Sequence, residues 1–192
     1  SGAGRGGCPR NLRRAAGELD PVCEEREGWL VTYQDQIVKM TQRAVLDLIE
    51  AVESLPPNSR DWQPTPQSRS ALNQLREIAM GPRYLIPLLS DFRSDSFSLH
   101  GPSGIAGADE DLTTFDAIRA EALAGLAELC QQMAHVPDEK LDAEVILPFA
   151  GGMTMTLADV LALHYWNATY HLGQVNYLSV LAADALPASS ET

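Results

Sequence analysis

Apolar residues recur every three or four positions along four long segments of this sequence, and turn-forming residues separate the segments. The segments run over about residues 27–54, 68–91, 113–135 and 156–183. This spacing predicts amphipathic α-helices, because every third or fourth residue lies on the same face of a helix. Four such helices bury their apolar faces most simply by packing together. We therefore predict an all-α, up-down four-helix bundle.

The connections between these predicted helices differ in length and composition. A long loop rich in Ser, Gly and Asp follows the second helix over residues 93–111, and loops of that length are commonly functional or mobile. Pro82 is expected to kink the second helix, because proline removes a backbone donor. An extended connection over residues 136–155 precedes the fourth helix, whose start resembles a capping box formed by Thr156 and Asp159.

Length and charge limit the class of protein. The 192 residues suffice for one domain; we expect residues 1–26 to be a disordered or loosely packed N-terminal segment and residues 27–186 to form the bundle. A net charge of -12 argues against a nucleic-acid partner, because a phosphate backbone would be repelled. The sequence predicts no membrane-spanning segment. Three cysteines without paired spacing are typical of a reducing, cytoplasmic environment.

The fourth predicted helix carries a polar stripe in the middle of its apolar face. Counted in steps of three and four from Leu157, this face is apolar at both ends and polar at four middle positions. Each buried hydrogen-bonding group left unpaired would cost about 1–3 kcal/mol. The four groups therefore satisfy one another in a structural network, or they bind water, a ligand or a metal ion. They are His164, Asn167, His171 and Gln174.

Helical spacing limits which of these groups can share one ion. Asn167 and His171 lie on adjacent turns and could contact the same ion or water. The Cα atoms of His164 and His171 are about 10 Å apart on a helix. Because this separation is wide for two ligands of one metal, His164 is expected to support the site from its edge. Imidazole suits zinc, nickel or iron, whereas an amide oxygen is a weaker and harder ligand.

The segment HYWNATYHLGQV, residues 164–175, resembles the signature of the DinB-like superfamily, which includes thiol-dependent S-transferases related to maleylpyruvate isomerase. The resemblance extends from the second to the fourth helix and implies an up-down four-helix bundle with a long connection. Members typically hold a divalent metal with three histidines: one on the second helix and an H-x3-H pair before Gly-Gln on the last. His171 and the following Gly173 and Gln174 match this pattern, but Asn167 replaces the first histidine of the pair.

On the second helix, the best register of this resemblance places Glu77 at the histidine position. A register one residue earlier would place Arg76 there, which would exclude a metal. The resemblance therefore implies a metal triad of Glu77, Asn167 and His171. Three further side chains are expected to orient these ligands or line the site: His164, Gln174 and Tyr170.

Two functions are compatible with this altered triad. In the first, a divalent zinc, nickel or iron ion and a low-molecular-weight thiol support a metal-dependent hydrolase or S-transferase that acts on a small molecule. In the second, the metal has been lost, and Glu77 accepts a hydrogen bond from His171 or pairs with its protonated form. The bundle then binds a small molecule or a protein partner without catalysis. The resemblance also suggests a homodimer.

Overall fold

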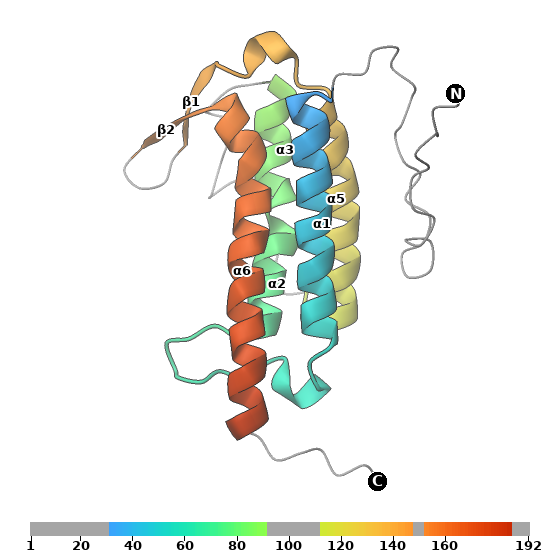
Figure 1. Cartoon of the computed structure of the whole chain (residues 1–192), viewed down its shortest axis with the longest axis vertical. Coiled ribbons are helices and arrows are strands. Elements are labelled where there is room, and N and C mark those ends of the chain that lie inside the picture. The colour runs from blue at the N-terminus through green and yellow to red at the C-terminus, as the bar shows by residue number, and fades with distance from the viewer. Residues whose placement is uncertain (1–30, 92–111, 148–151, 186–192) are drawn as a thin grey trace, which may run out of the picture. The chain divides into compact units, whose positions relative to one another are not determined.

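The computed structural model of the chain describes residues 31–91, 112–147 and 152–185 (Figure 1). The helices within these residues are α1 (Tyr33–Glu53), α2 (Ala71–Met80), α3 (Pro82–Asp91), α5 (Phe115–Ala134) and α6 (Leu157–Ala185). The other elements are two 3₁₀ turns, η2 (Pro57–Ser59) and η4 (Asp138–Lys140), and two strands, β1 (Glu144–Leu147) and β2 (Met153–Thr156). The prediction of an all-α helical bundle is confirmed.

Four helical columns pack side by side in the bundle (Figure 1). α1, α5 and α6 form one column each, and α2 and α3 together form the fourth. Gly81 at the end of α2 keeps right-handed helical backbone angles, and α3 begins directly at Pro82. The second helix is thus divided into α2 and α3 at the place where the sequence predicted a kink.

α5 runs parallel to α2 and α3, and α6 runs parallel to α1 (Figure 1). The predicted up-down order was therefore wrong, because the second and third helical columns run in the same direction. Two contacts show this parallel direction. Arg76 Nε donates to Leu112 O over 2.7 Å, and further along both segments Arg83 pairs with Glu121. The connection between α3 and α5, over residues 92–111, lies outside the described residues.

Capping boxes fix where two of the helices begin. Asp159 N donates to Thr156 Oγ1 and Thr156 N donates to Asp159 Oδ2, each over 3.2 Å, so the capping box predicted for the last helix is confirmed. Thr32 and Asp35 form a second capping box at the start of α1. The predicted start of the first helix near residue 27 was too early, because this cap begins the helix at Tyr33.

An antiparallel hairpin forms in the connection before α6. β1 and β2 pair with Val145 opposite Met155. Val145 and Leu147 are buried, whereas Ile146 between them is exposed. The extended conformation predicted here is confirmed, but the strand pairing was missed, because four residues are too short for alternation to stand out.

The core consists of two adjoining clusters of buried apolar side chains along the bundle. α6 contributes Leu161 to one cluster and Ala168 to the other. His164 therefore lies where the two clusters meet, and His171 lies between Ala168 and Val175 of the same cluster. The polar groups of α6 are thus inserted into an otherwise apolar interior.

No helix among the described residues is long and apolar enough to cross a bilayer. The prediction for residues 1–26 concerns residues outside the described part of the chain. The cytoplasmic location and the absence of a nucleic-acid partner stay predictions from the sequence.

Candidate functional site

The structure brings together the three residues predicted as a metal triad. Glu77 lies on α2, and Asn167 and His171 lie one turn apart on α6. Asn167 Nδ2 donates to Glu77 Oε1 over 3.1 Å, and His171 Nε2 lies 3.2 Å from the same oxygen. Arg76, the residue of the alternative register, donates to the carbonyl of Leu112 instead.

The His171 ring is almost fully buried, with only 2% of the residue exposed. Its Nδ1 lies 2.9 Å from Oε1 of Gln74 and 3.3 Å from Oε1 of Gln174. Because amide oxygens only accept hydrogen bonds, Nδ1 must carry a hydrogen. His171 Nε2 faces Glu77 Oε1 on the other side of the ring. The contact is not aligned as a hydrogen bond.

Arg69 occupies the other oxygen of the Glu77 carboxylate. Its Nη1 pairs with Glu77 Oε2, and its Nε donates to Asn73 Oδ1 over 2.7 Å. The interaction with His171 is the largest cause that lowers the pKa of Glu77 to about 2, and hydrogen bonds from Arg69 and Asn167 add to it. Partial burial of the carboxyl opposes this shift. Glu77 is therefore ionised at neutral pH, with donors at both oxygens. We call this group the α2–α6 polar cluster: Arg69, Gln74, Glu77, Asn167, His171 and Gln174.

The three residues predicted to support the triad have different surroundings. Gln174 contacts His171, as described above. Tyr170 is 53% exposed, its ring meets the His171 ring edge-on with 5.5 Å between centroids, and it stacks on Trp166. His164 makes no hydrogen bond with the cluster or with any other described residue. It belongs to a neighbouring pocket, so the expectation that it orients the triad is not met within the described structure.

The polar stripe of α6 is less buried than predicted. His164 is as deeply buried as His171, but Asn167 and Gln174 lie at the edge of the buried face. Ala168 and Val175 occupy buried positions instead. The prediction of four polar groups in the centre of this face was wrong, because steps of three and four follow a 3.5-residue period, whereas a straight α-helix has 3.6 residues per turn.

Two members of the cluster were not predicted from the sequence. Gln74 is 2% exposed and lies three residues before Glu77, on the same side of α2. That spacing was a usable signal, since residues three apart are neighbours on a helix. Arg69 precedes the Ser70 N-cap of α2. Its contact with Glu77 depends on the path of the chain before the helix, which the sequence pattern does not predict.

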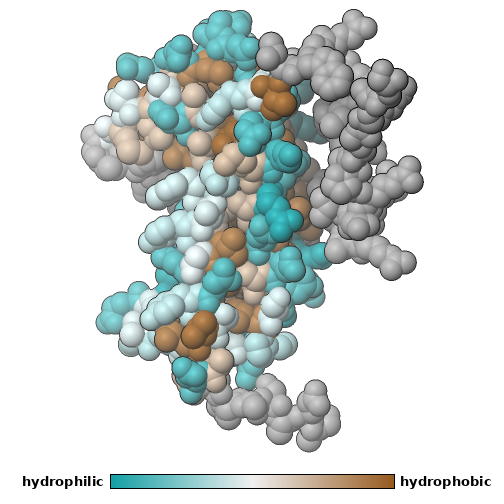
Figure 2. Space-filling model, viewed as in Figure 1, coloured by the Kyte–Doolittle hydropathy of each residue, from teal (hydrophilic) through white to brown (hydrophobic). Residues whose placement is uncertain are grey.

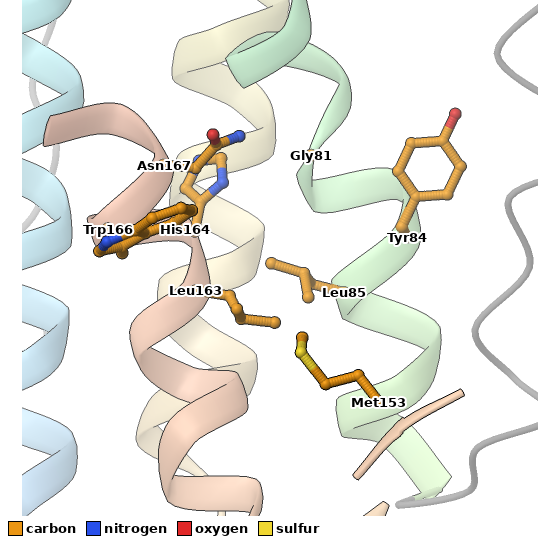
Figure 3. Close-up of a pocket in the computed structure, with 8 residues that line it drawn as sticks. All are labelled: Gly81, Tyr84, Leu85, Met153, Leu163, His164, Trp166 and Asn167. Carbon is orange, nitrogen blue, oxygen red and sulfur yellow. The ribbon is translucent and has the colours of Figure 1, made fainter. Parts of the chain in front are cut away.

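A pocket of about 260 Å³ lies beside the cluster, between α6 and the junction of α2 and α3 (Figure 3). Its wall is mostly apolar, with Leu85, Leu163, Met153 and Trp166 among the lining residues. Asn167 lines the pocket and also donates to Glu77, so it connects the pocket to the polar cluster.

His164 is the buried polar group of this pocket. Burial lowers the pKa of His164 to about 4, so its ring is neutral at neutral pH. In Figure 3 the ring lies on the side of α6 that faces Gly81. A Cβ atom at Gly81 would lie 2.8 Å from both Cε1 and Nδ1 of His164. Because this contact is too close for any side chain, the glycine provides the space in which the imidazole sits.

The donor atoms of the cluster do not fit a three-ligand metal site. Asn167 presents its NH₂ group, not its oxygen, to the carboxylate, as it must beside an acceptor. Glu77 is already paired with the Arg69 cation, and His171 offers one nitrogen. Nowhere in the described ranges do three His, Cys, Asp or Glu side chains gather at metal-binding spacing. A divalent ion would have to turn the amide of Asn167 and compete with a guanidinium for the carboxylate.

These features define a helical bundle with a charged cluster and an apolar pocket between α2–α3 and α6. The family model described as the DinB superfamily matches residues 40–175, which include the cluster from Arg69 to Gln174 and the residues that line the pocket. The chain belongs to the DinB superfamily. A search of curated proteins found no match.

Proposed function

We propose that this chain is a metal-independent member of the DinB superfamily that binds a small molecule without catalysis, the second of the two functions compatible with its sequence. One observation carries the proposal: Arg69 and Asn167 both donate to Glu77, at the place where a metal would need the carboxylate and the amide oxygen as ligands. The positive charge beside Glu77 then comes from Arg69. The adjacent pocket provides the binding space.

The position of His171 argues against direct acid–base catalysis by this residue. The ring is 2% exposed, and its two nitrogens face Gln74, Gln174 and Glu77. A general base needs hydrogen-bond access to the proton that it removes from a substrate. Because described residues surround both nitrogens, the described part of the chain leaves no open position for a substrate beside this imidazole. We therefore assign His171 a role in joining α2 to α6.

The competing function is a metal-dependent hydrolase or thiol S-transferase. It would need a divalent ion on Glu77, Asn167 and His171 and a low-molecular-weight thiol from solution. The described part of the chain offers no reactive thiol of its own, because burial raises the pKa of Cys130 to about 11. One observation supports this competing function. Nε2 of His171 lies beside a carboxylate oxygen of Glu77 without forming an aligned hydrogen bond to it.

Metal uptake distinguishes the two functions. The purified chain is stripped with a chelator, dialysed against zinc, nickel, iron(II) or manganese, and analysed for bound metal. We expect no stoichiometric metal in the native chain. The positive control combines Arg69→Ala with Asn167→His, which removes the competing cation and adds an imidazole one turn from His171; we expect this variant to take up zinc. One equivalent of metal in the native chain, absent in His171→Ala, would overturn the proposal.

The exposed face of α6 supports a second proposal, a homodimer. Its exposed apolar and aromatic side chains follow a heptad spacing, and a Cβ added at Gly173, in their middle, would have nothing within 4 Å. No charged residue occurs between Val160 and Ala183, and Figure 2 shows mostly pale side chains over the middle of α6. Two chains of net charge -12 associate most easily through an uncharged face, which favours a second copy as the partner. The exposed side chains are Trp166, Tyr170, Tyr177 and Val180.

A further inference from the structure

We infer that the pocket between α6 and the α2–α3 junction binds a neutral, largely apolar small molecule with one hydroxyl-like group, which His164 recognises. The inference rests on the proposed small-molecule binding and adds the chemical class of the ligand. Its basis is the combination of an apolar cavity with one deeply buried imidazole that has no hydrogen-bond partner among the described residues.

The imidazole of His164 is available for a ligand. The residue is 2% exposed, lines the cavity and makes no hydrogen bond to a described residue. A ligand that pairs with this ring therefore gains a hydrogen bond without displacing a described protein partner. A neutral imidazole has one donor and one acceptor nitrogen. A hydroxyl group, which both donates and accepts, is the simplest complement to either nitrogen.

The walls of the cavity determine the rest of the ligand. Leu85, Leu163, Met153 and Trp166 form apolar and aromatic surface, which favours a hydrocarbon or aromatic body. None of the eight lining residues is a lysine, an arginine or a carboxylate. An anionic ligand would therefore lose its hydration without gaining a cationic partner. The volume of about 260 Å³ lies just below the usual range for drug-sized ligands, about 300–1,000 Å³, so a molecule with a single ring fits best.

Gly81 provides the space that the His164 ring occupies. The backbone at Gly81 is right-handed helical, a conformation that every residue type adopts, so no backbone strain requires glycine here. The requirement is spatial, because a Cβ would meet the His164 ring at 2.8 Å. The break between α2 and α3 thus accommodates the imidazole at the wall of the cavity.

Phenol and toluene test the inference directly, because they share a ring and differ mainly in the hydroxyl group. Binding to the chelator-treated full chain is measured by calorimetry and by the ¹⁵N and ¹H shifts of the His164 ring. We expect phenol to bind at least five times more tightly than toluene and to shift the His164 ring signals. Benzoate, which carries a charge, should bind more weakly than phenol. Equal affinities for phenol and toluene, or no binding of either at millimolar concentration, would overturn the inference.

Three variants locate the binding. His164→Leu should abolish the preference for phenol while toluene still binds. Met153→Phe fills the cavity from the hairpin and should weaken both ligands more than tenfold, without a change on any helix. Thr154→Phe is the matched control, because Thr154 is the exposed neighbour of Met153 on the same strand; both affinities should persist. Unchanged binding in Met153→Phe would place the ligand elsewhere and contradict the inference.

The metal measurement and the phenol measurement test two separate claims. A chain that takes up one equivalent of zinc, yet prefers phenol over toluene in its metal-free form, would overturn metal independence alone. A chain that stays metal-free but does not distinguish phenol from toluene would overturn the ligand class alone.

Discussion

Nε2 of His171 on α6 lies 3.2 Å from Oε1 of Glu77 on α2. The opposite ring nitrogen of His171 contacts Gln74, which lies one turn before Glu77 on α2. The imidazole is thus held between two residues of one neighbouring helix, and this arrangement fixes both its orientation and its tautomer. Arg69, which precedes α2, pairs its positive charge with the Glu77 carboxylate.

Replacing Glu77 tests how much this cluster contributes to stability. Glu77→Gln should lower the free energy of unfolding at pH 7 by about 1–2 kcal/mol, a figure reduced for solvent screening because the side chain is 40% exposed. The lowered pKa of Glu77, about 2, means that its stabilising contribution is present above pH ~4.5 and is lost as the pH falls towards 2. Urea unfolding between pH 7 and 2.5 measures both effects.

Glu121→Gln is the matched control for that experiment. Glu121 also pairs with an arginine, Arg83, but it has no buried histidine beside it. Its loss should change the free energy of unfolding by less than about 0.5 kcal/mol. Equal effects of the two substitutions would mean that His171 and Asn167 add nothing to the Glu77 interaction.

The buried ring of His164 should make the chain sensitive to mild acid. Burial lowers the pKa of His164 to about 4, so between pH 6.5 and 4 the unfolded chain binds a proton that the folded chain does not. Stability should therefore fall as the pH decreases from 6.5 to 4, by up to about 3 kcal/mol. His164→Gln should flatten this part of the pH profile. An unchanged profile in His164→Gln would contradict the assignment.

Two helical glycines should respond in opposite ways to alanine. Gly173→Ala should stabilise the chain by about 0.5–1 kcal/mol, because nothing lies within 4 Å of the new Cβ and alanine favours a helix. Gly81→Ala should destabilise it by about 1–3 kcal/mol, because the Cβ meets His164. Thermal unfolding of dilute protein compares the two variants. Stabilisation in both would mean that the His164 ring moves freely and does not need the space at Gly81.

A charge on the exposed face of α6 should separate the proposed dimer. Tyr177→Glu introduces a carboxylate among exposed apolar side chains of a chain that is already acidic, so it should shift the sedimentation equilibrium to monomer. Val31→Glu, at a 74% exposed position outside α6, should leave the association constant unchanged. A native chain that sediments as a monomer at 100 micromolar would contradict the proposal.

The sequence predicted the parts of the fold that depend on local patterns. Apolar periodicity predicted the bundle, and Thr156 with Asp159 predicted the start of α6. The resemblance to the DinB-like superfamily brought Glu77, a residue of another helix, into the same site as His171. These successes have a common cause, because each depends on spacing along one segment or on a short motif.

The sequence did not predict the surroundings of these residues. Arg69 reaches Glu77 through the path of the chain before α2, and no periodicity encodes that path. His164 was expected to support the triad, but its ring faces Gly81. It lies three residues before Asn167, which is less than one helical turn of 3.6 residues, so the two side chains point in different directions. The hairpin was missed because its pairing joins short segments across a turn. Tertiary packing decides all three features.

The ¹⁵N chemical shifts of the His171 ring during a zinc titration test the metal-independent cluster most directly, because they report on the nitrogen that a metal would bind. The structure predicts a hydrogen on Nδ1 and no change at Nε2 up to a tenfold excess of zinc, whereas the Arg69→Ala, Asn167→His variant should respond. A shift of the native Nε2 signal that is complete at one equivalent of zinc would contradict the account and establish a metal site at Glu77 and His171.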